Sequence, residues 1–283
     1  MDLESFNTSR ESLVPLLALN NKSNKNIIIF PTDKEAIEFS TDFSNLNKNI
    51  FHLPSWDTLS YDSFVPSFDI QGKRLEIAHL LLTNNNYNIA TSIKAISQRI
   101  YFEELEICKI ELNEEIDFDS LIENLIHLKY QRKDRVESKG SFAIRGGQLD
   151  VYPINYDLPL RVIFNGDLVN EIKTFDTISQ RSVSEKKDIL IVPATELFQI
   201  KHSDILNLSS DKKEILDDYE LFQYSQNLDL EKCLLDLTSN VSLHIVDKNI
   251  VDNQLKEIID IEKDTFENLK QYFSLEIRNF KSR

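Results

Sequence analysis

The stretch SFAIRGGQLDVY, residues 141–152, decides the fold of the middle of this chain. Apolar residues alternate with other residues on both sides of Gly146-Gly147, which is the pattern of two half-buried strands joined at a glycine bend or bulge. A second pair follows, because residues 160–164 and 168–175 flank Asn165-Gly166, a typical hairpin turn. The middle of the chain is therefore expected to be antiparallel and β-rich.

Before this stretch, strands and helices are expected to alternate. Three short apolar runs have the composition of buried strands: residues 26–30 (NIIIF), 50–53 and 87–91. Helical patterns follow them, the first starting at Pro31-Thr32-Asp33 and continuing to about Leu46, the others at 70–82 and 93–100. Strands that alternate with helices are typical of a parallel sheet, so we expect an α/β lobe here.

The remaining patterns connect these two parts. Residues 106–112 alternate as a strand and 118–130 repeat as an amphipathic helix, so the β-rich part is expected to be α+β. A strand is expected at 189–193 and another at 241–246, with helical stretches at 211–224, 228–237 and 251–273. We expect three segments: residues 1–108 as the first part of the α/β lobe, 109–192 as an inserted α+β domain, and 193–283 as a mostly helical continuation of the lobe.

The composition restricts the class of protein. At 283 residues the chain is about two domains long. Its net charge of −15 argues against a protein that coats nucleic acid with its whole surface, because phosphate binding needs a basic surface. No apolar run approaches the ~18 residues that would cross a bilayer, and the N-terminus lacks the features of a secretory signal. We therefore expect a cytoplasmic protein with no membrane partner, in which Cys108 and Cys233 are core thiols.

One basic segment interrupts this acidic composition. Between residues 129 and 145 there are six basic side chains and two acidic ones: Lys129, Arg132, Lys133, Arg135, Lys139 and Arg145 against Asp134 and Glu137. Guanidinium groups form bidentate pairs with carboxylates and stack on aromatic rings, so Arg132, Arg135 and Arg145, with Phe142, are candidate anchors for an acidic protein partner. Two alternatives are a solvated surface in which Arg145 pairs with Asp150 or Glu137, and a direct nucleic-acid site.

No pattern of catalytic chemistry is recognisable. A P-loop needs glycines that let backbone N–H groups surround phosphates, and a lysine that reaches them. The single Gly-Lys pair, Gly72-Lys73, is followed by Arg74, and Ser67 stands where a P-loop needs a glycine, so a helix N-terminal turn is expected instead of a nucleotide loop. The GxSxG, HExxH and dinucleotide motifs are absent. We expect no catalytic residue, no cofactor and no metal site in this chain.

Two other features have ordinary structural explanations. His79 falls on the apolar stripe of the helix at 70–82 and is expected at the edge of a core. Trp56, Tyr61 and Phe64 form an aromatic loop that is expected either to cap the core or to meet a partner.

Three stretches together resemble a known family. LPSWDTLSYDSFVPSFDIQGKRL (53–75), YQRKDRVESKGSFAIRGGQLDVYPINYDLPLRVIFNGDLVNEIKTFDTISQRS (130–182) and ILIVPATEL (189–197) are similar to the N-terminal region of bacterial transcription-repair coupling factors, the Mfd family, which is itself similar to UvrB. The resemblance covers about residues 26–197. It implies a degenerate helicase-like, parallel-sheet lobe into which a UvrB-interaction domain is inserted, the module through which both proteins bind UvrA.

Departures from UvrB narrow this interpretation. UvrB keeps an intact P-loop at the start of its lobe, whereas this chain has NTSRESLVPLLA at residues 7–18, so nucleotide binding is not expected. The long hairpin with which UvrB probes DNA has no room after Pro66. Where UvrB-type sequences have F-R-x-R-G, Ala143 replaces the first arginine and Arg145 keeps the second.

The resemblance thus predicts a non-catalytic module of transcription-coupled DNA repair that recruits UvrA through the inserted domain. RNA polymerase, DNA, ATP and Mg²⁺ would be bound only by parts of the family that these 283 residues lack. The alternative hypothesis is the nucleotide-binding lobe of an ATP-dependent DNA translocase of UvrB type, with direct DNA contact.

Overall fold

The computed structural model describes residues 25–45, 50–58, 65–100, 104–199 and 233–261. They form two compact units. The first takes its described residues from 25–65, 81–99 and 233–261, and the second from 66–80 and 100–199. The second unit therefore lies, in sequence, between parts of the first. The predicted domain limits at residues 108 and 192 stay a prediction.

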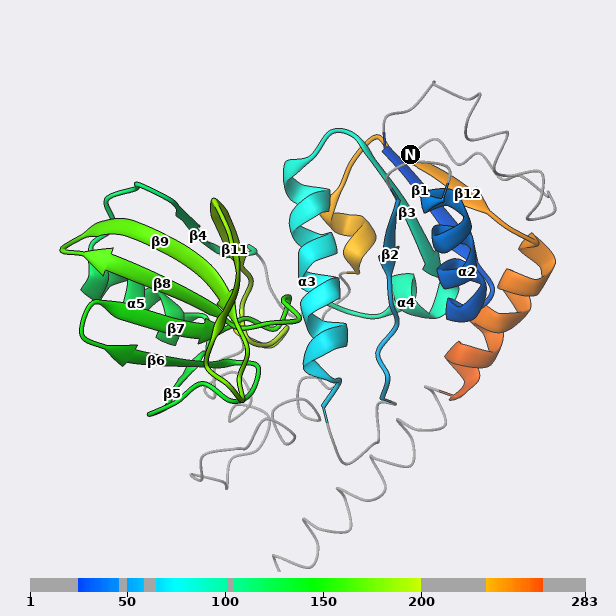
Figure 1. Ribbon diagram of the computed structural model, residues 1–283. Helices are drawn as coiled ribbons and strands as arrows, with labels where there is room; N and C mark the ends of the chain where they lie inside the picture. The colour runs from blue at the N-terminus through cyan, green and yellow to red at the C-terminus, as the bar shows by residue number, and fades with distance from the viewer. Residues whose placement is uncertain (1–24, 46–49, 59–64, 101–103, 200–232, 262–283) are drawn as a thin grey trace, which may run out of the picture. The chain divides into compact units, whose positions relative to one another are not determined.

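The first unit is built on a four-stranded parallel sheet (Figure 1). Its strands are β1 (Lys25–Phe30), β2 (Phe51–Leu53), β3 (Tyr87–Ser92) and β12 (Ser242–Ile245), in the order β12-β1-β3-β2. Because β1 lies between two other strands, its NIIIF run is buried along almost its whole length, as a central parallel strand requires. The parallel sheet and its predicted strands are confirmed.

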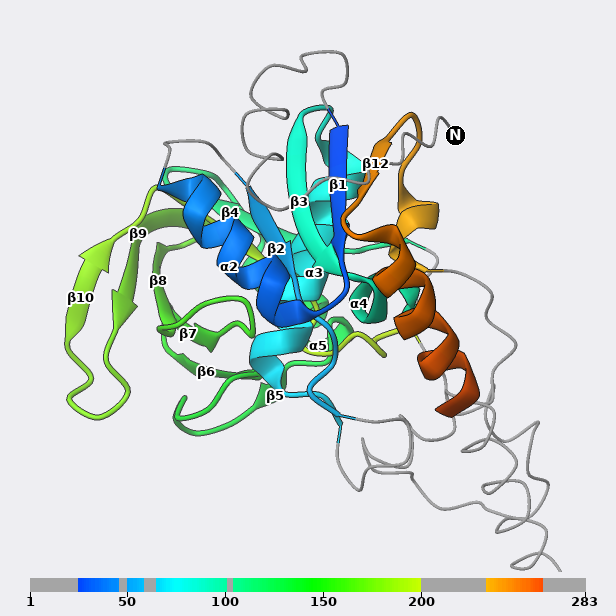
Figure 2. The ribbon, with the colours of Figure 1, turned by 90° about the vertical axis from the view of Figure 1, so that its right-hand side faces the viewer.

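Helix α2 (Asp33–Ser44) begins directly after β1. Thr32 is its N-cap, with Oγ1 accepting a hydrogen bond from the Glu35 amide at 3.3 Å. Phe39 and Phe43 of the helix pack in one aromatic row with Phe30 of the strand, with ring centroids 5.1 Å and 5.6 Å apart along the row. Figure 2 shows this helix in front of the sheet. The predicted helix start at residues 31–33 is confirmed.

The C-terminal segment returns to this sheet. β12 pairs in parallel with β1, and residues 248–261 after it are helical. Residues 211–224 and 228–232 lie outside the described residues, and the described end of the stretch at 228–237 contains a short 3₁₀ helix, η1 (Leu234–Leu237). The strand expected at 241–246 is thus confirmed, and it forms an edge of the parallel sheet. The remaining helix of this unit, α4 (Ile93–Ser97), is capped by Ser92.

The second unit contains a six-stranded sheet with the order β10-β9-β8-β7-β6-β5. The strands are β5 (Gln131–Arg132), β6 (Ser141–Arg145), β7 (Gln148–Tyr152), β8 (Leu160–Asn165), β9 (Leu168–Phe175) and β10 (Ser182–Glu185). All neighbours are antiparallel except β5 and β6, which are parallel. Gly146 and Gly166 have φ of 60° and 62° at the two hairpin turns, a conformation that favours glycine. The predicted antiparallel, β-rich character is confirmed.

One face of this sheet is covered by helix α5 (Phe118–His127). Leu121 and Leu125 of the helix share a core with alternate residues of the strands, among them Leu149 and Val162. The short pair β4 (Cys108–Glu111) and β11 (Asp188–Ile191) extends this core. Burial raises the pKa of the Cys108 thiol to about 12, so Cys108 is the inert core thiol that was expected, whereas Cys233 is half-buried.

Helix α3 (Phe68–Thr83) packs into the second unit as far as Leu80. A Cβ on Gly72 would lie 2.5 Å from the carbonyl oxygen of Ile154, so this glycine permits close backbone approach. Two residues further on, Arg74 forms a buried ion pair with Glu196, with Nε and Oε1 2.9 Å apart. Gly72-Lys73 therefore lies inside a helix and is not a nucleotide loop. His79 on the same helix is partly buried, and burial lowers its pKa, as expected at a core edge.

Trp56 is buried, with 6% of its surface exposed. It therefore belongs to the core, which was one of the two expectations for the aromatic loop. Tyr61 and Phe64 lie outside the described residues.

Candidate partner-binding site

The first arginine of the predicted basic segment lies on the edge strand β5. Arg132 is exposed there, and its strand pairs with β6 on one side only. Within the described ranges its guanidinium has no hydrogen bond and no ion pair. Its donors are therefore available to a partner.

Arg135 lies in the loop between β5 and β6, and its side chain contacts the turn between β9 and β10. Its Nη2 donates to the carbonyl oxygens of Thr177 at 2.9 Å and of Ile178 at 3.4 Å. Nε lies 3.7 Å from Oε1 of Glu137, and 43% of the arginine side chain remains exposed. Arg135 thus links the basic segment to the turn between β9 and β10 while keeping part of its guanidinium in solvent.

Arg145 ends β6 and is exposed. Its Nη2 donates to the backbone carbonyl of Asp134 at 3.2 Å. The expected alternative, in which Arg145 pairs with Asp150 or Glu137, is wrong: Arg161 binds Asp150 through two hydrogen bonds of 2.7 and 2.9 Å, and Glu137 lies beside Arg135. The cross-strand neighbour of Arg145 is Gln148, which carries no charge.

Phe142 requires a correction. It is fully buried in the core beneath α5, so its ring is not available to a partner. The physical reason is strand geometry: Phe142 and Arg145 are an odd number of positions apart on β6, and successive side chains point to opposite faces. The arginine belongs to the face away from α5, and the phenylalanine belongs to the core.

The lysines of the segment differ from one another. Lys133 is exposed, and its Nζ lies 3.4 Å from the Ser138 hydroxyl. Only 14% of the Lys139 side chain is exposed, because it pairs with Asp69 and donates to the Ile154 carbonyl at 3.0 Å. Lys139 is therefore part of the packing of α3.

The face of the sheet away from α5 carries a buried ion pair that the sequence patterns did not reveal. Asp150 is 4% exposed and lies directly across from Arg161 in the β7–β8 register. The Arg161 guanidinium also stacks on the Phe175 ring, 4.4 Å from its centroid, and donates to the Gln180 carbonyl at 3.3 Å. The hydrogen bond to Asp150 raises the pKa of Arg161. The pair holds the base of the turn at 176–181.

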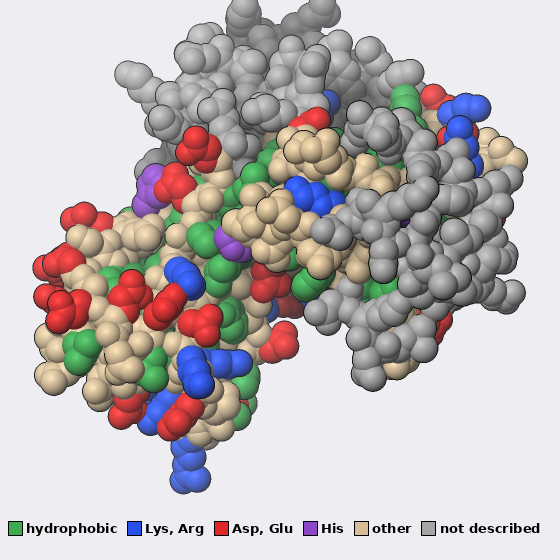
Figure 3. Space-filling view, turned by 90° about the horizontal axis from the view of Figure 1, so that it is seen from above, with side chains coloured by type: hydrophobic (Ala, Val, Ile, Leu, Met, Phe, Trp, Pro, Cys, Tyr) green, Lys and Arg blue, Asp and Glu red, His purple; other side chains and the backbone are tan. Residues whose placement is uncertain are grey.

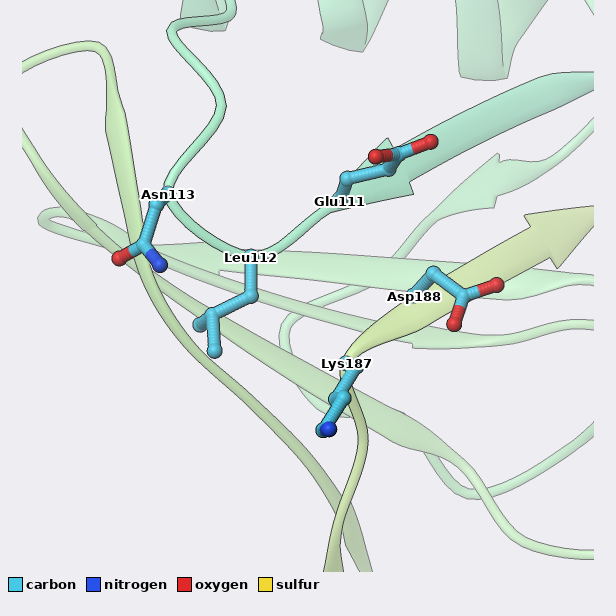
Figure 4. Close-up of a pocket in the computed structure, with 5 residues that line it drawn as sticks. All are labelled: Glu111, Leu112, Asn113, Lys187 and Asp188. Atoms are coloured by element: carbon cyan, nitrogen blue, oxygen red, sulfur yellow. The ribbon is translucent and has the colours of Figure 1, made fainter.

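Elsewhere on this unit the surface is acidic. Figure 3 shows acidic side chains gathered over the face of the unit that it presents. A pocket of about 410 Å³ lies beside the β4–β11 pair and is lined by Glu111, Leu112, Asn113, Lys187 and Asp188 (Figure 4). The carboxylates of Glu111 and Asp188 come from neighbouring strands. No residue of the basic segment lines this pocket. The basic segment remains the candidate site.

In the first unit, polar side chains meet at the carboxyl ends of the parallel strands, where α/β sheets commonly bind ligands. The Asp33 carboxylate accepts hydrogen bonds from the Ser55 amide at 3.2 Å, from the Ser55 hydroxyl, and from the Ser92 hydroxyl at 2.9 Å. An acidic side chain therefore occupies the start of α2, the position at which a phosphate would seek N–H donors.

The described residues contain no group of three or more His, Cys, Asp or Glu side chains placed to hold a metal ion. They also contain no helix that is both long enough and apolar enough to cross a membrane.

The basic segment falls within a stretch of the chain that is similar to a known domain. The family model of the UvrB interaction domain matches residues 108–197. The transcription-repair-coupling factor of Escherichia coli (strain K12) is 27% identical over 67% of this chain and 18% of its own length. That of Bacillus subtilis (strain 168) is 26% identical over 88% of this chain and 24% of its own length. The UvrABC system protein B of Thermosipho africanus is 22% identical over 70% of this chain and 32% of its own length.

The chain thus spans less than a third of the length of each of these relatives. Residues 108–197 are similar to the UvrB interaction domain, and the chain is similar to the N-terminal region of transcription-repair-coupling factors.

Proposed function

We propose that this chain recruits UvrA through its UvrB interaction domain, as a non-catalytic part of transcription-coupled DNA repair. The observation that carries the proposal is the placement of Arg132, Arg135 and Arg145, three exposed arginines in the matched domain. None of the three guanidiniums is enclosed by a carboxylate pair of the kind that Arg161 makes with Asp150. They therefore keep donors for carboxylates of a partner.

The arginines suit an acidic partner by their geometry as well as by their charge. A guanidinium offers a planar fork of N–H groups that binds a carboxylate bidentately, and arginine is enriched among the residues that dominate interface affinity. The rest of the chain is acidic, with a net charge of −15, so a basic surface is a local exception that suits an acidic partner.

The first unit has a supporting role in this proposal. We propose that it is the degenerate helicase-like lobe, with the UvrB interaction domain as its insertion. The parallel sheet and the order of the units in sequence support this assignment. RNA polymerase, DNA and ATP would then be bound by parts of the relatives beyond the matched segment.

The test is surface plasmon resonance against immobilised UvrA. Arg145→Ala and Arg132→Ala should each weaken binding by about 2 kcal/mol, mostly through faster dissociation. Arg145→Lys should remain impaired, because an ammonium keeps the charge but loses the planar fork. Lys133→Ala is the matched control, and it should change mainly the association rate and its salt dependence.

Melting curves of each variant complete the test. Both arginines are exposed, so their replacement should leave the melting temperature nearly unchanged. A lower melting temperature of Arg145→Ala with intact UvrA affinity would show that the arginine is structural and would contradict the proposal.

A further inference from the structure

A second docking element lies beside the basic segment. The turn between β9 and β10, residues 176–181, presents Ile178 to solvent with 87% of its surface exposed, more than any other exposed large hydrophobic residue among those the structure describes. Single exposed apolar side chains are common on protein surfaces. What sets this one apart is how firmly its backbone is held.

The turn is held from within. The Asp176 carboxylate accepts hydrogen bonds from the Ser179 amide and hydroxyl, each 2.7 Å long, and the Gln180 amide donates to the Asp176 carbonyl at 2.8 Å. The backbone of the turn is therefore largely ordered before a partner binds, which lowers the entropic cost of binding.

The turn is also held from outside, by two arginines. Arg135 donates to the Thr177 and Ile178 carbonyls, and Arg161, fixed by the buried Asp150, donates to the Gln180 carbonyl. Arg145 bonds to the carbonyl of Asp134, the residue next to Arg135. Arg145, Arg135 and Ile178 consequently form one continuous strip that runs from the end of β6 to the β9–β10 turn.

We propose that Ile178 is an apolar anchor of the UvrA interface and that Arg135 is the positioning residue that holds it in place. The inference rests on the proposed function and names the surface it requires on UvrA: an apolar recess edged by carboxylates. The recess would take the isoleucine side chain, and the carboxylates would face the exposed parts of Arg135 and Arg145. Charge complementarity and apolar burial would thus act on adjacent residues, as in interfaces with a central anchor and a polar rim.

The experiment uses the whole chain and UvrA. Ile178→Asp should lower the affinity at least about tenfold, because it places a carboxylate in the apolar recess and beside the carboxylates that edge it. Ile178→Ser, which introduces no charge, should lower it less. Ile126→Asp is the matched control: this isoleucine is 54% exposed on α5, the helix that covers the opposite face of the sheet, and its affinity should stay within about twofold of the original.

A double-mutant cycle tests the role of Arg135. If Arg135 positions the anchor, Ile178→Asp should reduce the affinity by a smaller factor in an Arg135→Ala chain than in the original chain. Equal costs in the two backgrounds would refute the positioning role. Melting temperatures of the two Ile178 variants should match the original, because the Ile178 side chain is almost wholly in solvent.

The outcomes separate the two proposals. If the original chain does not bind UvrA, the proposed function fails. If it binds and Ile178→Asp binds equally well, the anchor is wrong and the proposed function stands. If the original chain self-associates in analytical ultracentrifugation and Ile178→Asp abolishes only that association, the occupant is a second copy of this chain and the anchor proposal is overturned.

Discussion

At the scale of single residues, two kinds of arginine are present in the second unit. Arg161 is 15% exposed in its side chain and makes two hydrogen bonds to a buried carboxylate. Arg132 and Arg145 are exposed and make at most a bond to a backbone carbonyl within the described part of the chain. The first kind supports the fold, and the second kind is free to bind.

Removing the guanidinium of Arg161 should therefore destabilise the protein. Arg161→Met leaves Asp150 buried without its counter-charge, which should lower the free energy of unfolding by about 3 kcal/mol. The measurement is the midpoint of urea denaturation. Lys173→Met is the matched control on the neighbouring strand, because Lys173 pairs with Glu171 at a more exposed position and should change stability much less. Equal losses in the two variants would contradict this account of the buried pair.

At the scale of elements, helix α3 is the part whose packing was hardest to foresee. Three successive contacts join it to the second unit: Gln71 Oε1 accepts from the Glu196 amide at 2.9 Å, Gly72 touches the Ile154 carbonyl, and Arg74 pairs with Glu196. The helix thus contacts the loop between β7 and β8 and the segment that follows β11. A glycine inside a helix normally costs stability, and here it allows this contact.

Gly72→Ala should reverse the usual effect of such a substitution. In an exposed helix interior alanine would stabilise by up to about 1 kcal/mol relative to glycine. Here the added Cβ meets a backbone oxygen, which cannot rotate away, so a loss of about 2 kcal/mol is expected. Thermal or urea denaturation measures it. The adjacent, exposed Lys73→Ala should be nearly neutral, and stabilisation by Gly72→Ala would show that the helix is not tightly packed there.

At the scale of the whole molecule, the two units differ in the chemistry that they offer. The first has a parallel sheet whose carboxyl end is filled by Asp33 and two serine hydroxyls. The second has an acidic surface with one strip of arginines. We propose binding of an acidic protein for the second unit. In the described part of the first unit the donors to Asp33 come from two serines, and neither is basic.

We expect that the chain neither binds nor hydrolyses ATP. The glycines and lysine of a P-loop are absent from residues 7–18, and an aspartate stands where the start of α2 would meet a phosphate. Isothermal titration calorimetry with ATP and Mg²⁺ tests this, with a UvrB protein as the positive control. Micromolar affinity, which corresponds to about 8 kcal/mol, would overturn the expectation. Asp33→Ser removes the carboxylate and tests whether the carboxylate alone excludes the nucleotide.

Much of this architecture could be predicted from local pattern. The run at residues 26–30, the alternation around Gly146-Gly147 and the turn at Asn165-Gly166 each depend on residues close together in sequence, and each became the expected strand or hairpin. The basic segment was visible for the same reason. The position of Phe142 could also have been worked out, since its parity with Arg145 on one strand places it on the opposite face.

Tertiary structure alone decided which charged groups meet. Asp150 is 11 positions from Arg161, and Arg74 is 122 positions from Glu196. No local pattern selects Arg161 over Arg145 as the partner of Asp150, because the choice depends on the register of β7 against β8. The exposure of Ile178 is decided in the same way, by contacts from Arg135 and Arg161 to a turn that is distant in sequence. Periodicity reports which side of an element is buried, but only the packed chain brings two elements to the distance at which a hydrogen bond forms.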